Sequence, residues 1–582
     1  MQTAADSDGD SKEFSISIAG VELTTGDRID FPRSGVTAIV GSNNSGKSTL
    51  LRQLTAHIAR GQQAAELDRT FLVRRVIFER SGTVNDGLAW VREHAVELDR
   101  GGQRVFYGPG VEGVRLEAIA TRLRDFGLGL HELNNLLVFY GDAWQRLQGA
   151  TPVEMRDTFS TPPSSPLHVL QDDYKLFEEL NRISLEVFRQ PLTLDRLSKR
   201  VNLRVGDPGV PTPRIDRVTE EYSTALSSLP ALMEQGDGMR SLLGLLVPLV
   251  TSAYPIVFID EPEAFLHPPQ AAALGRILGE QAKERGVQVI LATHDRNMLS
   301  GLLASKADVS IVRLNRSVDD ETSMHQLNVG DLREIWNDPV LRYSNALDGL
   351  FHRLVVLAEA DGDCRFYSAA LEESASDLGL PFPPGDVLFV PSGGKAGMSK
   401  LARALRAVNV PVAASPDMDL LNDRDTLKGL VQSLGGAWAE YERDYNLATA
   451  PFRQPRDKVL VSQIISTLNA VFADRGGEPF TAEVRGEFVT QLRVKESPWS
   501  DVKQYGELAF KGEAAQALQR LLSKLEQLGI VLARVGELER FAPALGVAKG
   551  AAWLPAALKA GAHKEPPARR HVAALAEAGK SA

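Results

Sequence analysis

Cysteine and long apolar runs are scarce in this sequence. The 582 residues contain one cysteine, Cys364, which excludes an intramolecular disulfide framework and a cysteine-cluster zinc site and fits a reducing compartment. No stretch reaches the roughly 18 uninterrupted apolar residues that a bilayer span needs. The polar start from Met1 to Ser11 lacks the apolar core of a signal peptide. We therefore expect a cytoplasmic protein with no membrane partner.

An excess of positive charge is also missing. The formal net charge of -10 disfavours adhesion to nucleic acid over the whole surface, because counterion release requires clustered Lys and Arg. A local basic groove is still a possible nucleic-acid site, with residues 196–204 and 403–406 as candidates. Interspersed charge of this kind is nevertheless typical of a solvated helix face. Hydrophobic and charged residues make up 43% and 24% of the chain, ordinary values for a globular protein. A chain of this length needs two or three hydrophobic cores.

The first chemical motif is a strand, a glycine-rich loop and a helix in sequence. Residues 35–40 form a short apolar, β-branched run, and residues 49–54 show a helical pattern. Backbone N–H groups of such a loop surround phosphate oxygens, the lysine reaches the β and γ phosphates, and the following hydroxyl binds Mg²⁺. The alternative is a helix-capping turn with an unrelated lysine. The candidate nucleotide-binding residues are Gly41, Asn44, Ser45, Gly46, Lys47, Ser48 and Thr49.

Two later apolar strands also end in polar residues. Residues 255–259 lead into Asp260 and Glu261, and residues 288–293 lead into His294. We expect Asp260 to hold Mg²⁺ and Glu261 to polarise the attacking water, because phosphoryl transfer depends on positioning and electrostatics. His294 lies where a γ-phosphate sensor is useful. Taken singly, each of these residues also fits a structural role at a strand end.

The order of these motifs resembles the ABC-ATPase superfamily, in particular its chromosome-maintenance, double-strand-break repair and overcoming-lysogenization-defect branch. Residues 235–241 precede an apolar helix where that family keeps its signature, although Gly236 and Gly238 stand in a sequence unlike the usual Leu-Ser-Gly-Gly-Gln. In the family, two heads enclose two nucleotides, so the resemblance implies a homodimer or a higher homo-oligomer. Residues 263–268 are similar to the family's extension after the acidic strand, with a simple loop as the alternative.

The region from about 61 to 230 interrupts this ATPase core and carries no chemical signature of its own. Gln145 follows an apolar run at 136–140 and matches the position of a magnesium-sensing glutamine in ABC ATPases, although a solvent-facing glutamine is the simpler interpretation. No sustained seven-residue repeat runs through the region, which disfavours the long coiled-coil arms of the chromosome-maintenance branch.

A second group of strands follows residue 350 and again ends in carboxylates. The expected strands are residues 354–358, 386–390 and 410–414, separated by helical patterns, which predicts a small parallel sheet. Ligands of such sheets bind at the carboxyl ends of the strands. Hard oxygen ligands at this edge suit Mg²⁺ or Mn²⁺. The candidate metal ligands and catalytic acids are Glu359, Asp363, Asp417 and Asp419.

This arrangement resembles a TOPRIM domain, the fold shared by topoisomerases, primases and overcoming-lysogenization-defect nucleases. The departure is Ala360, where the family usually has glycine. An expected strand at 529–535 leads into Glu537 and Glu539, which the resemblance assigns to a second metal. Lys549, or alternatively Lys503, would stabilise the charge on the phosphorane. The alternative is that these acids are solvated loop ends or the remnant of a site that no longer cleaves.

The sequence thus predicts an α/β protein with an ABC-type ATPase head at 1–350, a TOPRIM-like parallel-sheet domain at 351–560, and a flexible tail at 561–582. The resemblance implies an ATP-regulated, metal-dependent endonuclease, related to the Gabija-type nucleases of antiphage defence. The expected partners are nucleic acid, with DNA favoured over RNA although no residue selects between them, and a second protein subunit. The alternative function is an ATP-driven sensor or scaffold with an inactive TOPRIM domain, and a transporter ATPase is a more distant one.

Overall fold

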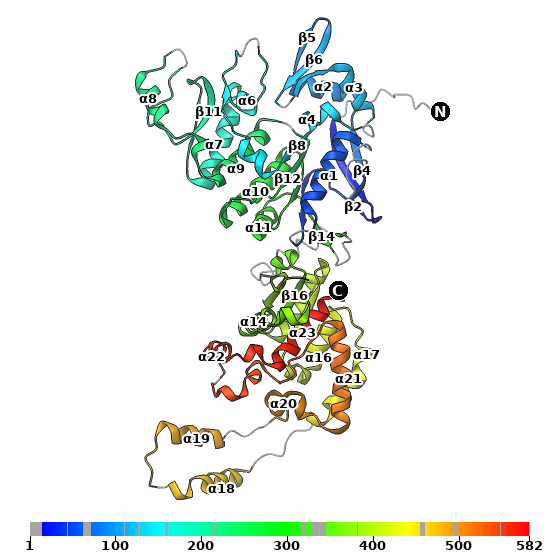
Figure 1. Ribbon diagram of the computed structural model, residues 1–582, viewed down its shortest axis with the longest axis vertical. Helices are drawn as coiled ribbons and strands as arrows, with labels where there is room; N and C mark the ends of the chain where they lie inside the picture. The colour runs from blue at the N-terminus through cyan, green and yellow to red at the C-terminus, as the bar shows by residue number, and fades with distance from the viewer. Residues whose placement is uncertain are drawn as a thin grey trace, which may run out of the picture. The chain divides into compact units, whose positions relative to one another are not determined.

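Figure 1 shows the protein as a computed structural model. The structure describes residues 14–42, 45–61, 72–109, 111–125, 129–157, 161–214, 217–252, 254–316, 322–327, 330, 337, 345–380, 382–453, 460–475, 477–492, 497–547 and 549–580. The chain divides into two compact units, residues 1–338 and 339–582, each with a hydrophobic core of its own. None of the described helices is both long and apolar enough to cross a membrane.

A six-stranded sheet forms the centre of the first unit. Its strands run in the order β15-β14-β3-β13-β12-β8, and all are parallel except β15 at one edge. The inner strands are apolar and β-branched because a parallel sheet is covered on both faces. The strands are β3 (Gly35–Val40), β8 (Val138–Gly141), β12 (Ile256–Asp260), β13 (Gln288–Ala292), β14 (Val309–Arg316) and β15 (Thr322–Leu327).

Helices and a second sheet pack against this core. Leu50 and Leu54 of α1 (Lys47–Arg60) are buried in the same cluster as Phe258 of β12. The antiparallel sheet β2-β1-β4 is linked to β13 by the buried side chain of Gln288, which bonds to both the N–H and the carbonyl of Ile18. The other elements of this part are β1 (Ser15–Leu23), β2 (Arg28–Asp30), β4 (Val73–Ser81), α9 (Asp237–Thr251), α10 (Pro268–Glu284) and α11 (Arg296–Ala304).

The region expected as an insertion at about 61–230 differs from the prediction, because it supplies β4 and β8 to the sheets of the ATPase core. The rest of the region forms two small antiparallel sheets and several helices. One sheet has the order β5-β6-β7 and the other β10-β11-β9. The short helix α5 (Ala143–Gln148) follows β8 and packs closely on α9. A Cβ atom on Gly244 of α9 would lie 1.8 Å from the carbonyl oxygen of Arg146, so glycine is required at this crossing. Bounds of the remaining helices and strands are α2 (Val84–His94), β5 (Val96–Arg100), β6 (Gln103–Gly108), β7 (Val111–Arg115), α3 (Leu116–Arg124), α4 (Asn134–Leu137), β9 (Val153–Glu154), α6 (Pro166–Asp172), α7 (Tyr174–Phe188), β10 (Leu192–Asp195), β11 (Arg200–Val205) and α8 (Glu220–Ser228).

The second unit contains the predicted small parallel sheet. Its order is β17-β16-β18, formed by β16 (Leu354–Ala358), β17 (Val387–Pro391) and β18 (Val412–Ser415). The strand expected at 529–535 is reduced to two parallel bridges, Ile530 with Ala414 and Ala533 with Asp417. This segment still runs beside β18 and delivers the following residues to the same edge of the sheet. The flanking helices are α14 (Asp361–Leu378), α15 (Lys395–Ala407), α16 (Arg424–Ser433), α17 (Ala439–Thr449), α20 (Trp499–Tyr505) and α21 (Gly512–Leu528).

The end of the chain differs from the expected flexible tail. Residues 566–580 form helix α23 (Pro566–Lys580), and its residues Val572 and Leu575 are buried in the core of the second unit. The segment is rich in alanine, and its small apolar residues recur every three or four positions, so it presents a narrow stripe that packs against α14. The helix was not predicted because the segment is polar overall and its apolar residues are small.

Candidate nucleotide and metal sites

The glycine-rich loop connects β3 to α1 as the sequence predicts. Gly46 has φ 98°, a left-handed conformation that favours glycine, and the helix begins at Lys47. A Cβ atom on Gly41 would lie 2.4 Å from the carbonyl oxygen of Leu314 in β14. Asn44 lies outside the described residues. The hydroxyl of Ser45 is buried and has no hydrogen-bond partner among the described residues, as expected for a loop shaped to bind oxygen atoms of a ligand.

Lys47, Ser48 and Thr49 form the first turn of α1. The Nζ atom of Lys47 donates to the carbonyl oxygens of Gly41 and Ser42, each at 3.0 Å. Burial lowers the pKa of Lys47, although the nearby carboxylates of the β12 loop act in the opposite direction. The ammonium group therefore lies inside the loop, where it can reach bound phosphates.

The structure brings the two expected magnesium ligands together. The Ser48 hydroxyl donates to Oδ1 of Asp260 at 2.9 Å, although the two residues are far apart in sequence. Burial raises the pKa of Asp260. A hydroxyl and a carboxylate oxygen at this distance form the start of an oxygen ligand set for Mg²⁺.

Glu261 and His294 also meet at the ends of β12 and β13. His294 Nδ1 lies 3.6 Å from Oε1 of Glu261 and 3.2 Å from Oε1 of Glu263. Glu263 is only 6% exposed and accepts hydrogen bonds from the Thr293 hydroxyl at 2.7 Å and the His294 N–H at 2.9 Å. Burial raises the pKa of Glu263. This buried carboxylate fixes the backbone of His294 and thereby orients its ring toward Glu261.

The loop after β12 has a strained backbone. Glu261 has φ 48° and Phe265 has φ 71°, values that non-glycine residues rarely adopt. Such strain persists only where surrounding contacts hold it, and it is concentrated at functional sites. Phe265 is 52% exposed, so the loop presents a large apolar side chain to solvent.

A buried arginine that the sequence did not reveal holds this loop. Arg146 is 1% exposed, and burial lowers the pKa of its guanidinium. Its three nitrogen atoms donate to the carbonyl oxygens of Gly141 at 3.1 Å, Asp260 at 2.5 Å and Glu261 at 2.8 Å, and to the hydroxyl of Ser241 at 3.1 Å. In the sequence, the only indication that Arg146 belongs to the site was its position next to Gln145. The Gln145 side chain is exposed, and its backbone N–H bonds to Asp142.

The glycines of the expected signature lie at the start of α9. Gly236 is the N-cap residue, and nothing lies within 4 Å of the position of a Cβ atom on it. A Cβ atom on Gly238 would lie 2.6 Å from the carbonyl oxygen of Phe265. Gly238 therefore permits the close contact between α9 and the strained loop after β12, and Gly236 leaves the end of the helix open.

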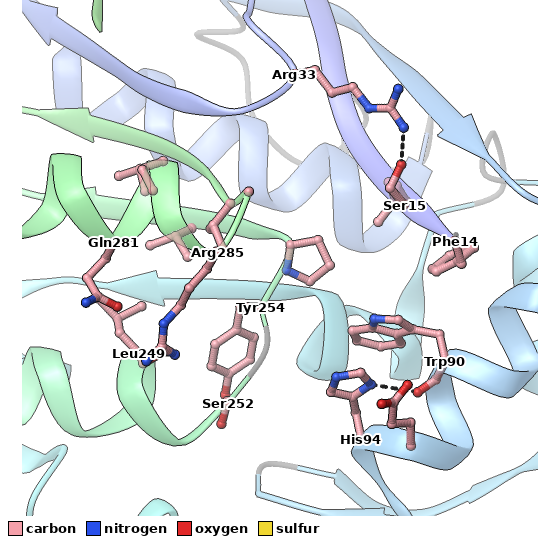
Figure 2. A pocket seen from close by; sticks show the side chains of 18 of the residues that line it. Phe14, Ser15, Arg33, Trp90, His94, Leu249, Ser252, Tyr254, Gln281 and Arg285 are labelled. Carbon is pink, nitrogen blue, oxygen red and sulfur yellow. Dashed lines mark hydrogen bonds between the residues drawn. The ribbon is translucent and has the colours of Figure 1, made fainter. Parts of the chain in front are cut away.

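A cavity of about 920 Å³ lies elsewhere in the first unit (Figure 2). Trp90 stacks on His94 at one side, with ring centroids 4.2 Å apart, and Tyr254 and Arg285 line the other side. Tyr254 precedes β12, so the cavity lies at the opposite ends of the strands from the glycine-rich loop. Arg285 is already paired with Glu179 at 3.0 Å. The cavity is therefore separate from the nucleotide site.

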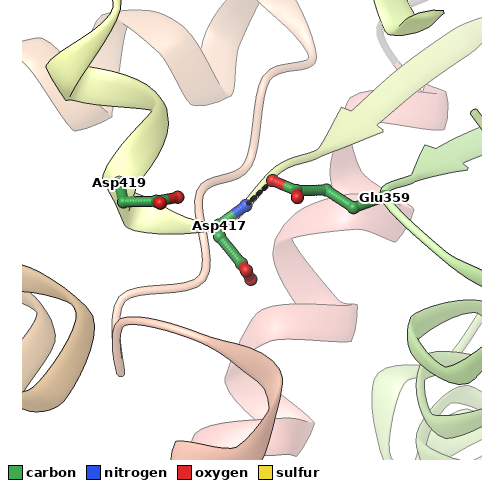
Figure 3. A group of neighbouring side chains, drawn as sticks. All are labelled: Glu359, Asp417 and Asp419. Carbon is green, nitrogen blue, oxygen red and sulfur yellow. Dashed lines mark hydrogen bonds between the residues drawn. The ribbon is translucent and has the colours of Figure 1, made fainter. Parts of the chain in front are cut away.

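In the second unit, three carboxylates converge at the predicted edge of the sheet (Figure 3). Glu359 follows β16, and Asp417 and Asp419 follow β18. One oxygen from each residue lies within 4.8 Å of the others. The N–H of Asp417 donates to Oε1 of Glu359 at 3.1 Å, which fixes the two strand ends relative to each other.

Asp363 has a different position from these three acids. It lies in the first turn of α14, and its Oδ2 accepts a hydrogen bond from the N–H of Ala360 at 3.0 Å, as in a capping box. Burial raises its pKa to about 6, and the negative charge of Glu359 acts in the same direction. Asp363 is thus close to the other carboxylates while serving to cap the helix.

The acids differ in how readily they ionise. Burial raises the pKa of Asp417 to about 8, and the neighbouring charges of Glu359, Asp363 and Asp419 add to this effect. Burial also raises the pKa of Glu359. For Asp419 burial acts to raise the pKa, but hydrogen bonds from two lysines outweigh it and the pKa lies below the usual value. Crowded carboxylates of this kind favour the binding of a cation.

Three lysines border the carboxylates. Lys395 forms an ion pair with Asp419, and Lys503 Nζ lies 2.9 Å from Oδ2 of the same residue. Lys549 Nζ lies 3.2 Å from Glu537 Oε2 and 3.4 Å from Glu539 Oε2. The structure therefore gathers the predicted residues of the second unit, and it adds Lys395. The glycine pair before Lys395, directly after β17, was the signal that could have identified it.

Two glycines, Gly506 and Gly536, allow the close backbone contacts that place Lys503 at the site. Gly506, just after α20, has φ 57°, and a Cβ atom on it would lie 2.0 Å from the carbonyl oxygen of Arg534. A Cβ atom on Gly536 would lie 2.4 Å from the carbonyl oxygen of Lys503. The backbone of α20 therefore contacts the segment that leads to Glu537.

Known proteins match parts of this chain. Residues 162–300, which include α9, Glu261 and His294, match the family described as "AAA domain, putative AbiEii toxin, Type IV TA system". Old nuclease from Escherichia phage P2 is 26% identical over 171 residues, which are 29% of this chain and 28% of Old nuclease. The uncharacterised protein MJECL11 from Methanocaldococcus jannaschii is 30% identical over 107 residues, which are 17% of this chain and 92% of that protein.

Solved structures show weaker likeness. The SMC head domain from Thermotoga maritima has 18% sequence identity and a TM-score of 0.27, with 55% of this chain and all of that chain covered. The Smc head domain from Pyrococcus furiosus, bound to the C-terminal domain of ScpA, has 12% identity and a TM-score of 0.30, with 55% and 98% covered.

The sheet order, the glycine-rich loop and the family match define the first unit as an ATPase domain within an α/β chain. The match with Old nuclease then identifies the relatives more closely. The chain is a homologue of Old nuclease, and the ATPase family match supports an OLD-type ATPase family. The matched segment spans about a quarter of Old nuclease, so this homology concerns the shared segment.

Proposed function

We propose that the protein is an ATP-regulated, metal-dependent endonuclease that cleaves phosphodiester bonds of nucleic acid. The observation that carries the proposal is the convergence of Glu359, Asp417 and Asp419, with oxygen atoms within 4.8 Å of one another, in a chain that also contains an ATPase domain. Homology to a protein named as a nuclease supports the same activity.

The carboxylates fit a divalent cation. Three carboxylate oxygens form a hard ligand set suited to Mg²⁺ or Mn²⁺. Burial, with the neighbouring carboxylates, raises the pKa of Asp417, so a bound cation would favour its charged form. Such an ion, when bound, would neutralise phosphate charge and activate a water molecule. Glu537 and Glu539 lie beside this group and are proposed to hold a second ion, with Asp363 as a further ligand. The arrangement follows the TOPRIM-like pattern.

The lysines have a separate role in the proposal. Lys549 and Lys503 carry positive charge at the border of the carboxylates, where each can stabilise the charge that develops on the attacked phosphate. Lys395, as the first residue of α15, is placed to bind a neighbouring phosphate of the backbone. Each of these lysines would exchange its carboxylate partner for phosphate when nucleic acid binds.

The nucleotide site has its own assignment of roles. Lys47 binds the β and γ phosphates of ATP, and Ser48 and Asp260 hold its magnesium ion. Glu261 orients the attacking water, and His294 contacts the γ phosphate from the end of β13. The open helix end at Gly236 and Gly238 completes the nucleotide site of a second copy, so the active ATPase is a homodimer or a higher homo-oligomer.

ATP is proposed to control cleavage, which would suit a protein of antiphage defence or of DNA processing. A sensor or scaffold without nuclease activity is the second candidate, and one observation favours it. Lys395 and Lys503 both pair with Asp419, so positive side chains already balance part of the charge that a cation would balance. The two functions differ in whether purified protein cleaves nucleic acid at all.

The test incubates purified protein with supercoiled DNA and separately with transfer RNA, with Mg²⁺ or Mn²⁺, and with or without ATP. We expect metal-dependent cleavage that changes with ATP and is lost in the Asp417→Asn, Asp419→Asn double variant. Asp361→Asn is the matched control, because its side chain is 66% exposed and is paired with Arg365 at the surface of α14.

The outcomes separate the candidates. Cleavage that survives in the double variant would remove these acids from the reaction. Absence of cleavage on both substrates, with ATP hydrolysis intact, would favour the sensor.

A further inference from the structure

Two helices of the second unit leave their apolar side chains in solvent. These helices, α18 (Val461–Phe472) and α19 (Ala482–Leu492), form a hairpin (Figure 1). Phe472 stacks on Phe488 with ring centroids 4.2 Å apart, which joins the two helices. No described residue of α18 is buried. Among the described parts of the chain, α18 packs mainly on α19 and on the short helix η9 (Ala473–Arg475).

The exposed side chains follow the repeat of a helix that packs against others. Apolar residues of α18 recur every three or four positions, in a stripe along one side of the helix. Val461 is 74% exposed, and Ile465 is 52% exposed. Further exposed apolar side chains of the hairpin are Leu460, Val471, Phe480, Val489 and Leu492. Exposed apolar side chains gathered on one hairpin mark an interaction site.

The charged residues of the hairpin formed by α18 and α19 indicate which kind of partner it can bind. Residues 460–473, which contain α18, include no charged side chain. The charged residues in the described part of the hairpin are Asp474, Arg475, Glu478, Glu483, Arg485 and Glu487, an excess of acids. Arg475 is already paired with both Glu478 and Glu487. Nucleic acid and anionic lipid surfaces both require basic side chains, so this hairpin suits neither.

A second copy of this chain does satisfy these conditions. In a twofold interface, residues near the symmetry axis meet their own copies, so a charge near the axis would oppose a like charge. The uncharged stripe of α18 avoids that repulsion. We infer that α18 and α19 form a self-association surface whose occupant is the hairpin of a second copy. Two helices from each copy would then form a four-helix bundle. This interface is independent of the nuclease activity and of the pairing of ATPase heads proposed above.

The first test measures the mass of the full-length protein by sedimentation at micromolar concentration without nucleotide. The Val461→Asp, Ile465→Asp double variant should associate about a hundredfold more weakly, since it loses two apolar anchors and opposes new charges. Leu185→Asp is the matched control, because Leu185 of α7 is a 42% exposed leucine outside the hairpin. Circular dichroism should be the same for all three proteins. Equal self-association of wild type and the double variant would overturn the inference.

Cross-linking tests the contact itself. Ser466 is an exposed residue of α18, and the native Cys364 is buried, so a Ser466→Cys protein has one accessible thiol. A short bismaleimide should join two copies through this residue, and the joined species should disappear when Val461→Asp and Ile465→Asp are added. The inference would be overturned if no joined species formed, or if it still formed with the two aspartates present. It would also be overturned if the Val461→Asp, Ile465→Asp variant lost binding to vesicles or DNA while its mass in solution stayed that of wild type.

Discussion

Replacement of Arg146 by lysine tests whether the buried guanidinium holds the nucleotide site together. Lysine keeps the charge but has one nitrogen, so it can replace the bonds of one guanidinium nitrogen and loses those to Glu261 O and Ser241 Oγ. Each hydrogen bond to a charged group contributes about 1.5 kcal/mol, which gives a loss of about 3 kcal/mol. In a domain of this size, this loss lowers the melting temperature by about 6 °C.

The effect on catalysis follows from the same contacts. The backbone of Glu261 loses its anchor, while the contacts of Lys47 and Ser48 are unchanged, so kcat for ATP hydrolysis should fall by about a hundredfold with little change in KM. Thermal unfolding and steady-state hydrolysis measure the two effects. Arg182→Lys is the matched control, because the Arg182 side chain is 65% exposed and pairs with Glu186 at 3.7 Å. A melting temperature within about 2 °C of wild type would refute the role assigned to Arg146.

Three further predictions concern both units. Glu261→Gln keeps the shape of the side chain but removes its charge, so hydrolysis should slow by about a hundredfold while bound ATP is retained on gel filtration; unchanged turnover would exclude Glu261 as the group that orients water. Burial lowers the pKa of His571 to about 3, so the unfolded chain takes up the proton first, below about pH 6.5, and stability falls by about 1.4 kcal/mol per unit as pH drops. Urea unfolding at pH 6.5 and 5 should show a smaller loss for His571→Gln, and an equal loss in both proteins would contradict this origin. Gly506→Ala should cost more stability, and more nuclease activity, than Gly512→Ala, because both glycines have positive φ but only Gly506 meets a carbonyl oxygen, at 2.0 Å; equal losses would contradict the packing argument.

The strands that carry the site could be predicted because their signal is local. The apolar runs at β3, β12 and β13 are confirmed as inner strands of a parallel sheet, since burial on both faces requires apolar residues throughout. The second parallel sheet is confirmed in the same way. Because parallel strands end at a common edge, the approach of Ser48 to Asp260 and of Glu359 to Asp417 also followed from the strand ends.

Contacts that depend on distant backbone atoms could not be predicted. Arg146 is buried because it meets three carbonyl oxygens from two loops, and nothing in its own helix distinguishes it from a surface arginine. Asp363 fitted the acidic pattern, yet its carboxylate also caps α14, a role that depends on where the helix begins. For Lys395 the preceding glycines were a local signal, but its pairing with Asp419 depends on α15 starting close to the end of β18.

The charges around the second site imply an order of binding. Among the described residues, six carboxylates gather here with four cationic side chains, Lys395, Lys503, Lys549 and Arg540. The carboxylates, which outnumber these cations, are Glu359, Asp363, Asp417, Asp419, Glu537 and Glu539. A polyanion approaching this negative excess is repelled, and each lysine it recruits would leave a carboxylate unpaired. Divalent ions should therefore enter first and nucleic acid second. Affinity for nucleic acid should rise with metal concentration even in a variant that cannot cleave.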